Sequence, residues 1–361
     1  MSFAAEARFV TVATCEPQVT SPEQIRRAAG DVQDWPEVVR LADQHGVVAF
    51  VRQSVARAGV AVPPAAEAPL RDAWVGQVAY VMSLDLALER ILDAFVQANI
   101  PVIVLKGPAL ARTIYPARTL RPYGDVDLTV HEDDQERAAA ALSANGFLEA
   151  PYEPEIARLA HADHGAEEAF HRIFVKEPQG LLIELHVDPL QLGIKPACEA
   201  GRWERAIAVP GLRGALMLGY EDQVVQLAVH AHKHAFGRLI WLKDLDLLLR
   251  RDHPLDWRIV SSVARSEGVR ASVWYALRLT SSLLRSDMPA QARAMRPSLP
   301  VRKLYELLWT EDNVVDLTAR ARWRTVQFRV ADSWRGMLPT LLLMGRRRDR
   351  ARGLAHAILR R

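Results

Sequence analysis

Two aspartates one residue apart are the side chains of this sequence best placed to do chemistry. Asp125 and Asp127 stand in the run Gly124-Asp125-Val126-Asp127-Leu128-Thr129-Val130, whose apolar members favour a β-strand. Side chains two apart along a strand point to the same face, so both carboxylates lie together, opposite the apolar ones. Carboxylates that close repel each other, and a divalent cation such as Mg²⁺ relieves the repulsion. The alternative is a polar face of an edge strand without a ligand.

A buried strand that runs into a helix is predicted upstream of the aspartates. Val102–Leu105 is apolar, and Lys106-Gly107-Pro108 follows it. Gly107 permits close approach to the backbone, and Pro108 suits the first turn of a helix. The free amides at a helix start attract anions, so we expect Lys106 to meet a phosphate at this turn.

A third carboxylate is predicted on a hairpin farther along the chain. The strand-like runs 169–175 and 181–187 are joined by the turn residues Glu177-Pro178-Gln179-Gly180. In the second run, Glu184 and His186 share the face opposite the apolar side chains. Glu184 would complete, with the two aspartates, a cluster able to hold two metal ions. His186 either contacts phosphate, a metal-bound water or a proton in transfer, or holds Glu184 in place.

The order and spacing of these pieces resemble the uncharacterised nucleotidyltransferase family (NTP_transf_5), a branch of the superfamily with the DNA polymerase β-like fold. The matching residues are Leu105-Lys106-Gly107, Leu110, Tyr115, Arg121, Gly124-Asp125-Val126-Asp127-Leu128 and Glu184-Leu185-His186. The segment 230–248 looks like the family's histidine helix followed by Trp241-Leu242-Lys243-Asp244-Leu245. The resemblance extends over most of the chain.

The resemblance implies an α+β protein with a polymerase β-like core, a small mixed sheet with flanking helices, between N-terminal and C-terminal helical regions. It implies a Mg²⁺-dependent enzyme that moves a nucleoside monophosphate from an NTP, with ATP as the default, to an acceptor, and releases pyrophosphate. The expected catalytic residues and ligands of two Mg²⁺ ions are Asp125, Asp127 and Glu184. The expected nucleotide-binding residues are Lys106, Gly107, Arg121 and His186.

Pro108 departs from the pattern of the wider superfamily, which has Gly or Ser after the glycine to hold a phosphate. Proline has no N–H to donate, so that part of the phosphate contact is missing. We therefore expect Lys106 and Arg121 to supply the charged phosphate contacts. The alternative for Lys106 is that it only covers apolar surface at a strand end.

Three regions are expected along the chain. Residues 1–98 are mainly helical, with a loop at Pro63-Pro64-Ala65-Ala66. Residues 99–192 alternate strand and helix and form the catalytic core, and residues 203–361 return to helix. In this last region Leu239–Leu249 is a predicted amphipathic helix, with Asp244 reaching the site and Asp246 in solvent.

Histidines stand at two further places, and the first of these invites a metal interpretation. His230 and His234 are spaced as in zinc metalloproteases, but Ala231 stands where those enzymes need a glutamate. We expect these two and His232 to form hydrogen bonds within the helical packing or to line the substrate side of the site. The loop histidines His161 and His164 lie either near the site or in solvent.

Composition is that of a globular cytoplasmic enzyme. Of 361 residues, 50% are apolar and 25% are charged, which allows a sizeable core. Cys15 and Cys198 have neither a disulfide pattern nor a zinc spacing, and we expect no signal peptide and no transmembrane segment. The net charge is +3, with arginines gathered in residues 320–361. No nucleic-acid motif accompanies them, so we expect a solvated basic tail and no nucleic-acid partner.

The acceptor of the nucleotidyl group is expected to be a small molecule, a natural product or a peptide, and the sequence carries no signal for an oligomeric state. Two other functions fit the same residues. One is a protein AMP-transferase of antitoxin type. The other is a non-catalytic nucleotide- or peptide-binding partner in a biosynthetic assembly, because a fold can outlive its chemistry. The intact set of Asp125, Asp127 and Glu184 argues against the loss of chemistry.

Overall fold

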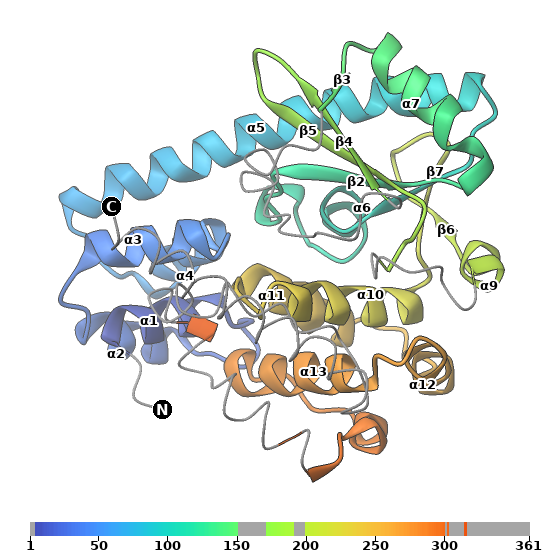
Figure 1. Cartoon of the computed structure of the whole chain (residues 1–361). Coiled ribbons are helices and arrows are strands. Elements are labelled where there is room, and N and C mark those ends of the chain that lie inside the picture. Colours follow the sequence, from blue (N-terminus) through green and yellow to red (C-terminus); the bar gives the residue numbers. More distant parts are fainter. Residues whose placement is uncertain (1–3, 151–170, 191–198, 300–301, 303–313, 316–361) are drawn as a thin grey trace, which may run out of the picture.

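The protein combines helical regions at both ends of the chain with a central mixed sheet (Figure 1). The computed structural model describes residues 4–150, 171–190, 199–299, 302 and 314–315. The predictions for His161, His164, Cys198 and the Arg-rich tail concern residues outside these ranges. The predicted α+β fold class is confirmed.

Five helices make up the described N-terminal region. They are α1 (Ala5–Thr14), α2 (Pro22–Gly30), α3 (Trp35–Gln44), α4 (Val48–Ala58) and the long α5 (Pro64–Gln97). The prediction of a loop at residues 63–66 is wrong, because Pro63 is the N-cap residue of α5 and Pro64 its first helical residue. Proline is accepted there because the first N–H groups of a helix have no partner within it.

The described residues form a mixed seven-stranded sheet in the order β3-β4-β5-β2-β1-β7-β6. The strands are β1 (Val102–Leu105), β2 (Asp125–Thr129), β3 (Leu148–Glu149), β4 (His171–Lys176), β5 (Leu181–His186), β6 (Ile207–Ala208) and β7 (Ala215–Met217). The central strand β2 is antiparallel to β1 and parallel to β5. The predicted hairpin is present as the antiparallel pair β4 and β5.

Two strands come from the part of the chain that was predicted to be helical. The strand β7 pairs in parallel with β1, and β6 lies beyond it at the sheet edge. Such short strands cannot show an alternating pattern, so their periodicity gives no signal. The division of the chain at 98, 192 and 203 stays a prediction, although residues after 203 contribute strands to the sheet.

The two faces of the sheet differ as the alternation of side chains predicts. One face is apolar and packs against α5 and α7 (Gln135–Ala144), and its buried members include Val104, Val126, Leu128 and Ile183. The ionisable residues predicted for the site lie on the other face: Asp125, Asp127, Glu184 and His186. In Figure 1, the helices α10 and α11 lie on the side of the sheet away from α5 and α7.

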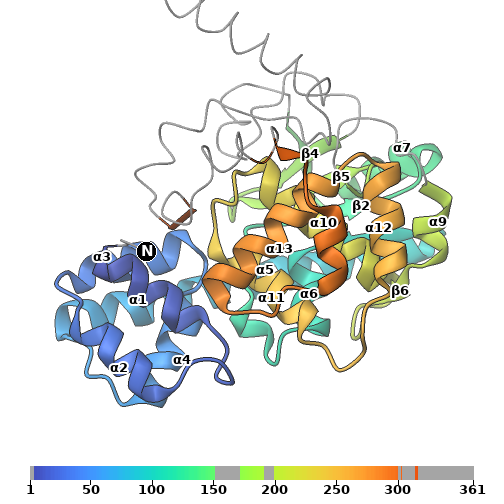
Figure 2. The same ribbon diagram turned by 90° about the horizontal axis from the view of Figure 1, so that it is seen from below.

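The C-terminal helices are α9 (Glu199–Glu204), α10 (Tyr220–Lys233), α11 (Leu239–Leu249), α12 (Trp257–Ser266) and α13 (Arg270–Leu284). The predicted helix over 239–249 is confirmed at both ends. The helices α10 to α13 share one apolar core with α1, α3 and α4, which includes Phe9, Phe50, Leu242 and Tyr275. Figure 2 shows α1 to α4 side by side with α11 and α13. No helix in the described ranges is long and apolar enough to cross a membrane.

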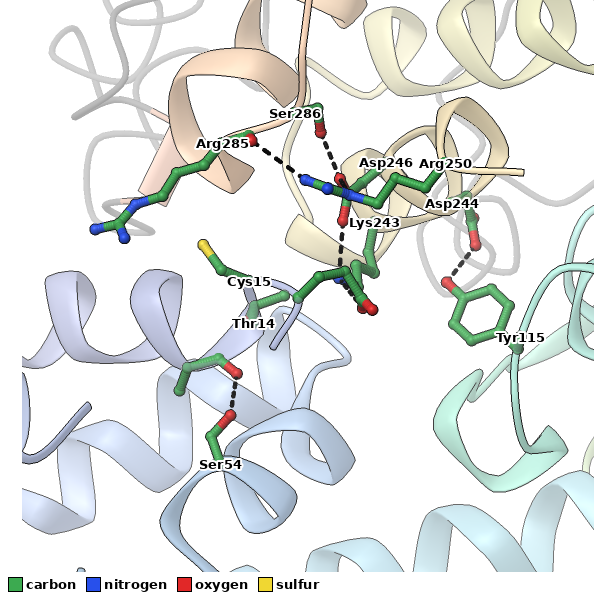
Figure 3. Close-up of polar contacts among 12 residues, drawn as sticks. Thr14, Cys15, Ser54, Tyr115, Lys243, Asp244, Asp246, Arg250, Arg285 and Ser286 are labelled. Atoms are coloured by element: carbon green, nitrogen blue, oxygen red, sulfur yellow. Dashed lines mark hydrogen bonds and ion pairs between the residues drawn. The ribbon is translucent and has the colours of Figure 1, made fainter. Parts of the chain in front are cut away.

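A buried ion-pair cluster joins the N-terminal and C-terminal helices (Figure 3). Lys243 Nζ lies 2.6 Å from Glu16 Oε1 and 2.8 Å from Asp246 Oδ2. Asp246 also accepts hydrogen bonds from Arg250, at 2.7 Å, and from the Ser286 hydroxyl. The prediction that Asp246 lies in solvent is therefore wrong. Helical spacing identified the apolar side of α11, but it could not reveal partners from distant segments.

His232 of α10 is buried against α13, and its burial should make the free energy of unfolding depend on pH. Its Nδ1 lies 2.7 Å from the Ser272 hydroxyl, and burial lowers the pKa of His232 to about 3. The folded protein keeps His232 neutral, whereas the unfolded chain protonates it near pH 6.5. This contribution to stability is therefore complete above pH 6.5 and is lost as the pH falls toward 3.

We expect His232→Gln to remove this pH dependence. The difference in free energy of unfolding between the wild type and His232→Gln should shrink by up to about 1.4 kcal/mol per pH unit below about pH 6.5. Urea unfolding of both proteins at several pH values measures it, with the exposed His253→Gln as the matched control. A difference that stays constant between about pH 7.5 and 5 would contradict the assignment.

Candidate active site

Asp127, Glu184 and His186 come together through the register of two parallel strands. Asp127 on β2 is the register partner of Glu184 on β5, and Thr129 is that of His186. Register partners place their side chains on the same face of a sheet. One carboxylate oxygen from each acidic residue and a ring nitrogen of His186 all lie within 4.8 Å of one another. The structure thus joins three of the residues that the sequence predicts for the site.

Asp127 is the most strongly compensated carboxylate of the group. Lys106 Nζ lies 3.0 Å from its Oδ1, and His186 Nε2 lies 3.2 Å from the same oxygen. Burial would raise the pKa of Asp127, but the charge of Lys106 and the hydrogen bond from His186 hold it well below its usual value. Asp127 is therefore ionised over the whole range in which the protein would work.

His186 bridges the two strands. Its Nε2 lies 3.3 Å from Glu184 Oε2 as well as next to Asp127. Burial alone would lower the pKa of His186, but hydrogen bonds to Asp127 and Glu184 raise it to about 9. A protonated His186 thus adds a second positive charge beside that of Lys106.

Asp125 shares the face but stands outside this three-residue group, as far as the described residues show. Burial, followed by the charges of Asp127 and Glu184, raises the pKa of Asp125 to about 7, and Lys106 and Arg121 offset this only in part. The negative charge of Asp125 is therefore the one that the site tolerates least. The repulsion expected from the Asp-x-Asp spacing falls mainly on this residue.

The donor set fits a divalent cation in either of two ways. Asp127 and Glu184 with His186 offer two oxygens and one nitrogen, which suits ions that accept imidazole, such as Mn²⁺ or Zn²⁺. Asp125 in place of His186 makes an all-oxygen set, which Mg²⁺ prefers. In both cases the added charge would relieve the crowding of carboxylates.

Lys106 is held in a backbone conformation that favours glycine. Its φ is +50° and its ψ is −122°, at the point where β1 ends and α6 (Gly107–Thr113) begins. Non-glycine residues in such regions are strained, and strain of this kind clusters at functional sites. The predicted turn at Lys106 is confirmed, and the side chain contacts Asp127 instead of merely covering apolar surface.

Gly107 has a packing reason to be glycine. A Cβ at this position would lie 2.6 Å from the Cβ of Tyr123. The Tyr123 hydroxyl donates to Asp85 on α5, and Arg112 lies 2.9 Å from the same carboxylate. These contacts fix the start of α6 against the sheet. A phosphate contact through the amides after Gly107 stays a prediction.

Arg121 is engaged by a buried aspartate of α11. Its Nε and Nη2 donate to the two oxygens of Asp244, each at 2.7 Å, and its Nη1 donates to the carbonyl of Pro122. The Tyr115 hydroxyl donates to Asp244 at 2.6 Å (Figure 3). Asp244 thus binds the predicted phosphate ligand, and Arg121 acts on Asp125 through its charge. Direct phosphate binding by Arg121 stays a prediction.

The rings of His230 and His234 gather around Trp241. Their centroids lie 4.9 Å and 5.2 Å from that of Trp241, and 4.7 Å from each other. Burial, followed by the charge of Lys106, lowers the pKa of His230 well below its usual value. Of the two predicted roles, a hydrogen bond within the helical packing is present for His232, which contacts the Ser272 hydroxyl. For His230 and His234 the structure shows ring contacts with Trp241, and the lining of the substrate side stays a prediction.

Arg238 is a neighbour of the site that sequence reasoning missed. Its charge interacts with those of Arg121 and Asp125. The residue stands between α10 and α11, where no periodic pattern signals which residues will face it.

Comparison with known proteins gives one match. A family model described as "Uncharacterised nucleotidyltransferase" matches residues 31–285, which include every residue named for the site above. No curated protein and no solved structure matches the chain.

Asp125→Asn and Asp127→Asn should change the stability of the metal-free protein in opposite directions. Asp125 is a buried charge opposed by its neighbours, so its neutralisation should leave the melting temperature unchanged or raise it. Asp127 compensates Lys106 and His186, so its neutralisation should cost about 3 kcal/mol of unfolding free energy.

Denaturant unfolding in the presence of a chelator measures both effects. The matched control is Asp72→Asn, at an exposed position paired with Arg71. Equal destabilisation by the two site substitutions would contradict the charge balance described here.

Proposed function

The chain belongs to the uncharacterised nucleotidyltransferase family, and we propose that it transfers a nucleoside monophosphate from ATP or another NTP to a small-molecule, natural-product or peptide acceptor. Family membership makes it an enzyme of class EC 2.7.7 with an NTP as substrate. The observation that carries the proposal is the convergence of Asp127, Glu184 and His186 on the polar face of the sheet, with Lys106 in contact. The released product would be pyrophosphate.

Asp127 and Glu184 would hold a divalent cation, with Asp125 or His186 as a further donor. When bound, such a cation polarises phosphate oxygens and lowers the pKa of an acceptor hydroxyl. We propose two Mg²⁺ ions, which Asp125, Asp127 and Glu184 would hold, because the three carboxylates together form an oxygen-only donor set. The raised pKa of Asp125 supports this, since an extra positive charge at this face would stabilise its ionised form.

The protein's own groups would position the reactants and move the proton. Lys106 would place its ammonium group, held at Asp127, against the phosphates of the nucleotide. Glu184 would accept the proton of the acceptor hydroxyl, and protonated His186, 3.3 Å away, would hold Glu184 in the ionised form that accepts it. Positioning and charge stabilisation supply most of the catalysis in transfers at phosphorus, and this site offers both.

Release of pyrophosphate from a panel of NTPs tests the proposal, with Mg²⁺ or Mn²⁺ and a cell extract as the source of acceptors. Glu184→Gln should lower the rate by at least about 100-fold, because it removes a charge aimed at the reacting groups. His186→Gln should cost less, since His186 acts beside the carboxylates. Mass spectrometry of the product would identify the acceptor.

Glu149→Gln is the matched control for these variants. Glu149 lies on β3 of the same sheet, where it pairs with Arg172, so its substitution should leave the rate unchanged. Absence of pyrophosphate release by the wild type under all conditions would contradict the proposed function. Equal losses in Glu184→Gln and His186→Gln would remove the separate role of Glu184.

A further inference from the structure

Arg238 is held in place by contacts that leave part of its guanidinium group available. Its Nε donates to the carbonyl oxygen of Gln44, the last residue of α3, at 3.1 Å. Its guanidinium carbon lies 5.9 Å from the centre of the Trp241 ring. Gly46 leaves room for Nη2, because a Cβ there would come within 3.0 Å of it. These contacts hold the Nε edge of the guanidinium at the end of α3.

Arg238 differs from the other buried arginines in its partners. Arg112, Arg121 and Arg202 each lie within 3 Å of a carboxylate oxygen. Within the described ranges, by contrast, no carboxylate lies within ion-pair distance of Arg238, and its two Nη atoms donate no hydrogen bond. Burial, followed by the charge of Arg121, lowers the pKa of Arg238. A half-buried cation without a counter-ion is costly, and an anionic ligand would offset that cost.

The surroundings of Arg238 connect it to the active site. The charges of Arg121 and Asp125 act on it, as do those of Asp43 on α3 and Asp244 on α11. Trp241, on which its guanidinium packs, also contacts His230, and His230 interacts with Lys106 and Asp127. Arg238 therefore lies on the same side of the protein as the proposed metal ligands.

We infer that Arg238 is a nucleotide-binding residue whose free Nη groups bind the phosphates of the NTP. It would take the role that sequence analysis gives to Arg121, whose donors are used by Asp244 and Pro122. A planar guanidinium offers two parallel donors to a phosphate, and the bond to Gln44 leaves the two Nη groups for that contact. The inference rests on the proposed nucleotidyl transfer and deepens it by naming a phosphate ligand.

The rival role for Arg238 is purely structural. A cation at the carboxyl end of α3 interacts favourably with the helix dipole, and the bond to Gln44 would clamp α3 to α11. A clamp would affect stability, whereas a phosphate ligand would affect affinity for polyphosphates.

Calorimetric titrations of the full-length protein in the presence of Mg²⁺ separate these roles. The titrants are inorganic tripolyphosphate, a non-hydrolysable NTP and a nucleoside monophosphate. Arg238→Gln should raise the Kd for tripolyphosphate and the NTP by roughly 10-fold or more, the size expected for a charged hydrogen bond. The Kd for the monophosphate should change less. Arg238→Lys should recover only part of the affinity, because it keeps the charge and loses the planar fork.

Arg26→Gln is the matched control, since Arg26 donates to the carbonyl of Ala58 at the end of α4, in the N-terminal region. It should leave every Kd unchanged. Melting temperatures measured on the same samples show whether the bond between Arg238 and Gln44 stabilises the fold. If Arg238→Gln does not fold, the Kd of Arg238→Lys for tripolyphosphate decides between the two roles, because lysine retains a charged donor at the same place. A raised Kd supports the phosphate ligand, and an unchanged Kd supports the clamp.

The outcomes are distinct. Binding of tripolyphosphate and NTP by the wild type, with equal affinity in the Arg238 variants, would overturn the role of Arg238 and leave the proposed function standing. A wild type that binds neither probe would overturn both. Weaker polyphosphate binding in the Arg238 variants, with Arg26→Gln like the wild type, is the result that we expect.

Discussion

Three carboxylates on one buried face of a sheet are the constraint on which this structure depends. Alternation along β2 and β5 puts apolar side chains into the core with α5, so the charged ones must share the opposite face. Lys106 and His186 compensate Asp127, and this leaves Asp125 as the unfavourable charge, with its pKa near 7. A site with this imbalance favours an added cation, and the family assignment explains what that cation would serve.

The helices outside the sheet complete the site as well as covering it. Asp244 of α11 binds Arg121 next to β2. Lys243 of the same helix forms an ion pair with Glu16, which ties α11 to the N-terminal region. The N-terminal and C-terminal helices share one apolar core, so the position of α11 depends on both ends of the chain. Arg238, at the start of α11, adds a hydrogen bond to the end of α3.

Local patterns predicted the site far better than they predicted its surroundings. A period of two places Asp125 with Asp127 on one face of a strand, and Glu184 with His186 on one face of another. The parallel pairing of β2 with β5 brings the two faces together. The short strands β6 and β7 carry no period. The burial of Asp246, the pair between Arg121 and Asp244 and the position of Arg238 depend on contacts between distant segments, which no spacing along the chain encodes.

The central claim about this protein is that the polar face of β2 and β5 binds a divalent cation together with a nucleotide. Crystals grown with Mn²⁺ and a non-hydrolysable NTP would test this directly, because anomalous scattering locates manganese without ambiguity. We expect manganese bound by oxygens of Asp127 and Glu184, with the triphosphate in contact with it. Manganese and nucleotide bound elsewhere, with Asp127 still in contact with Lys106 and His186, would contradict this claim.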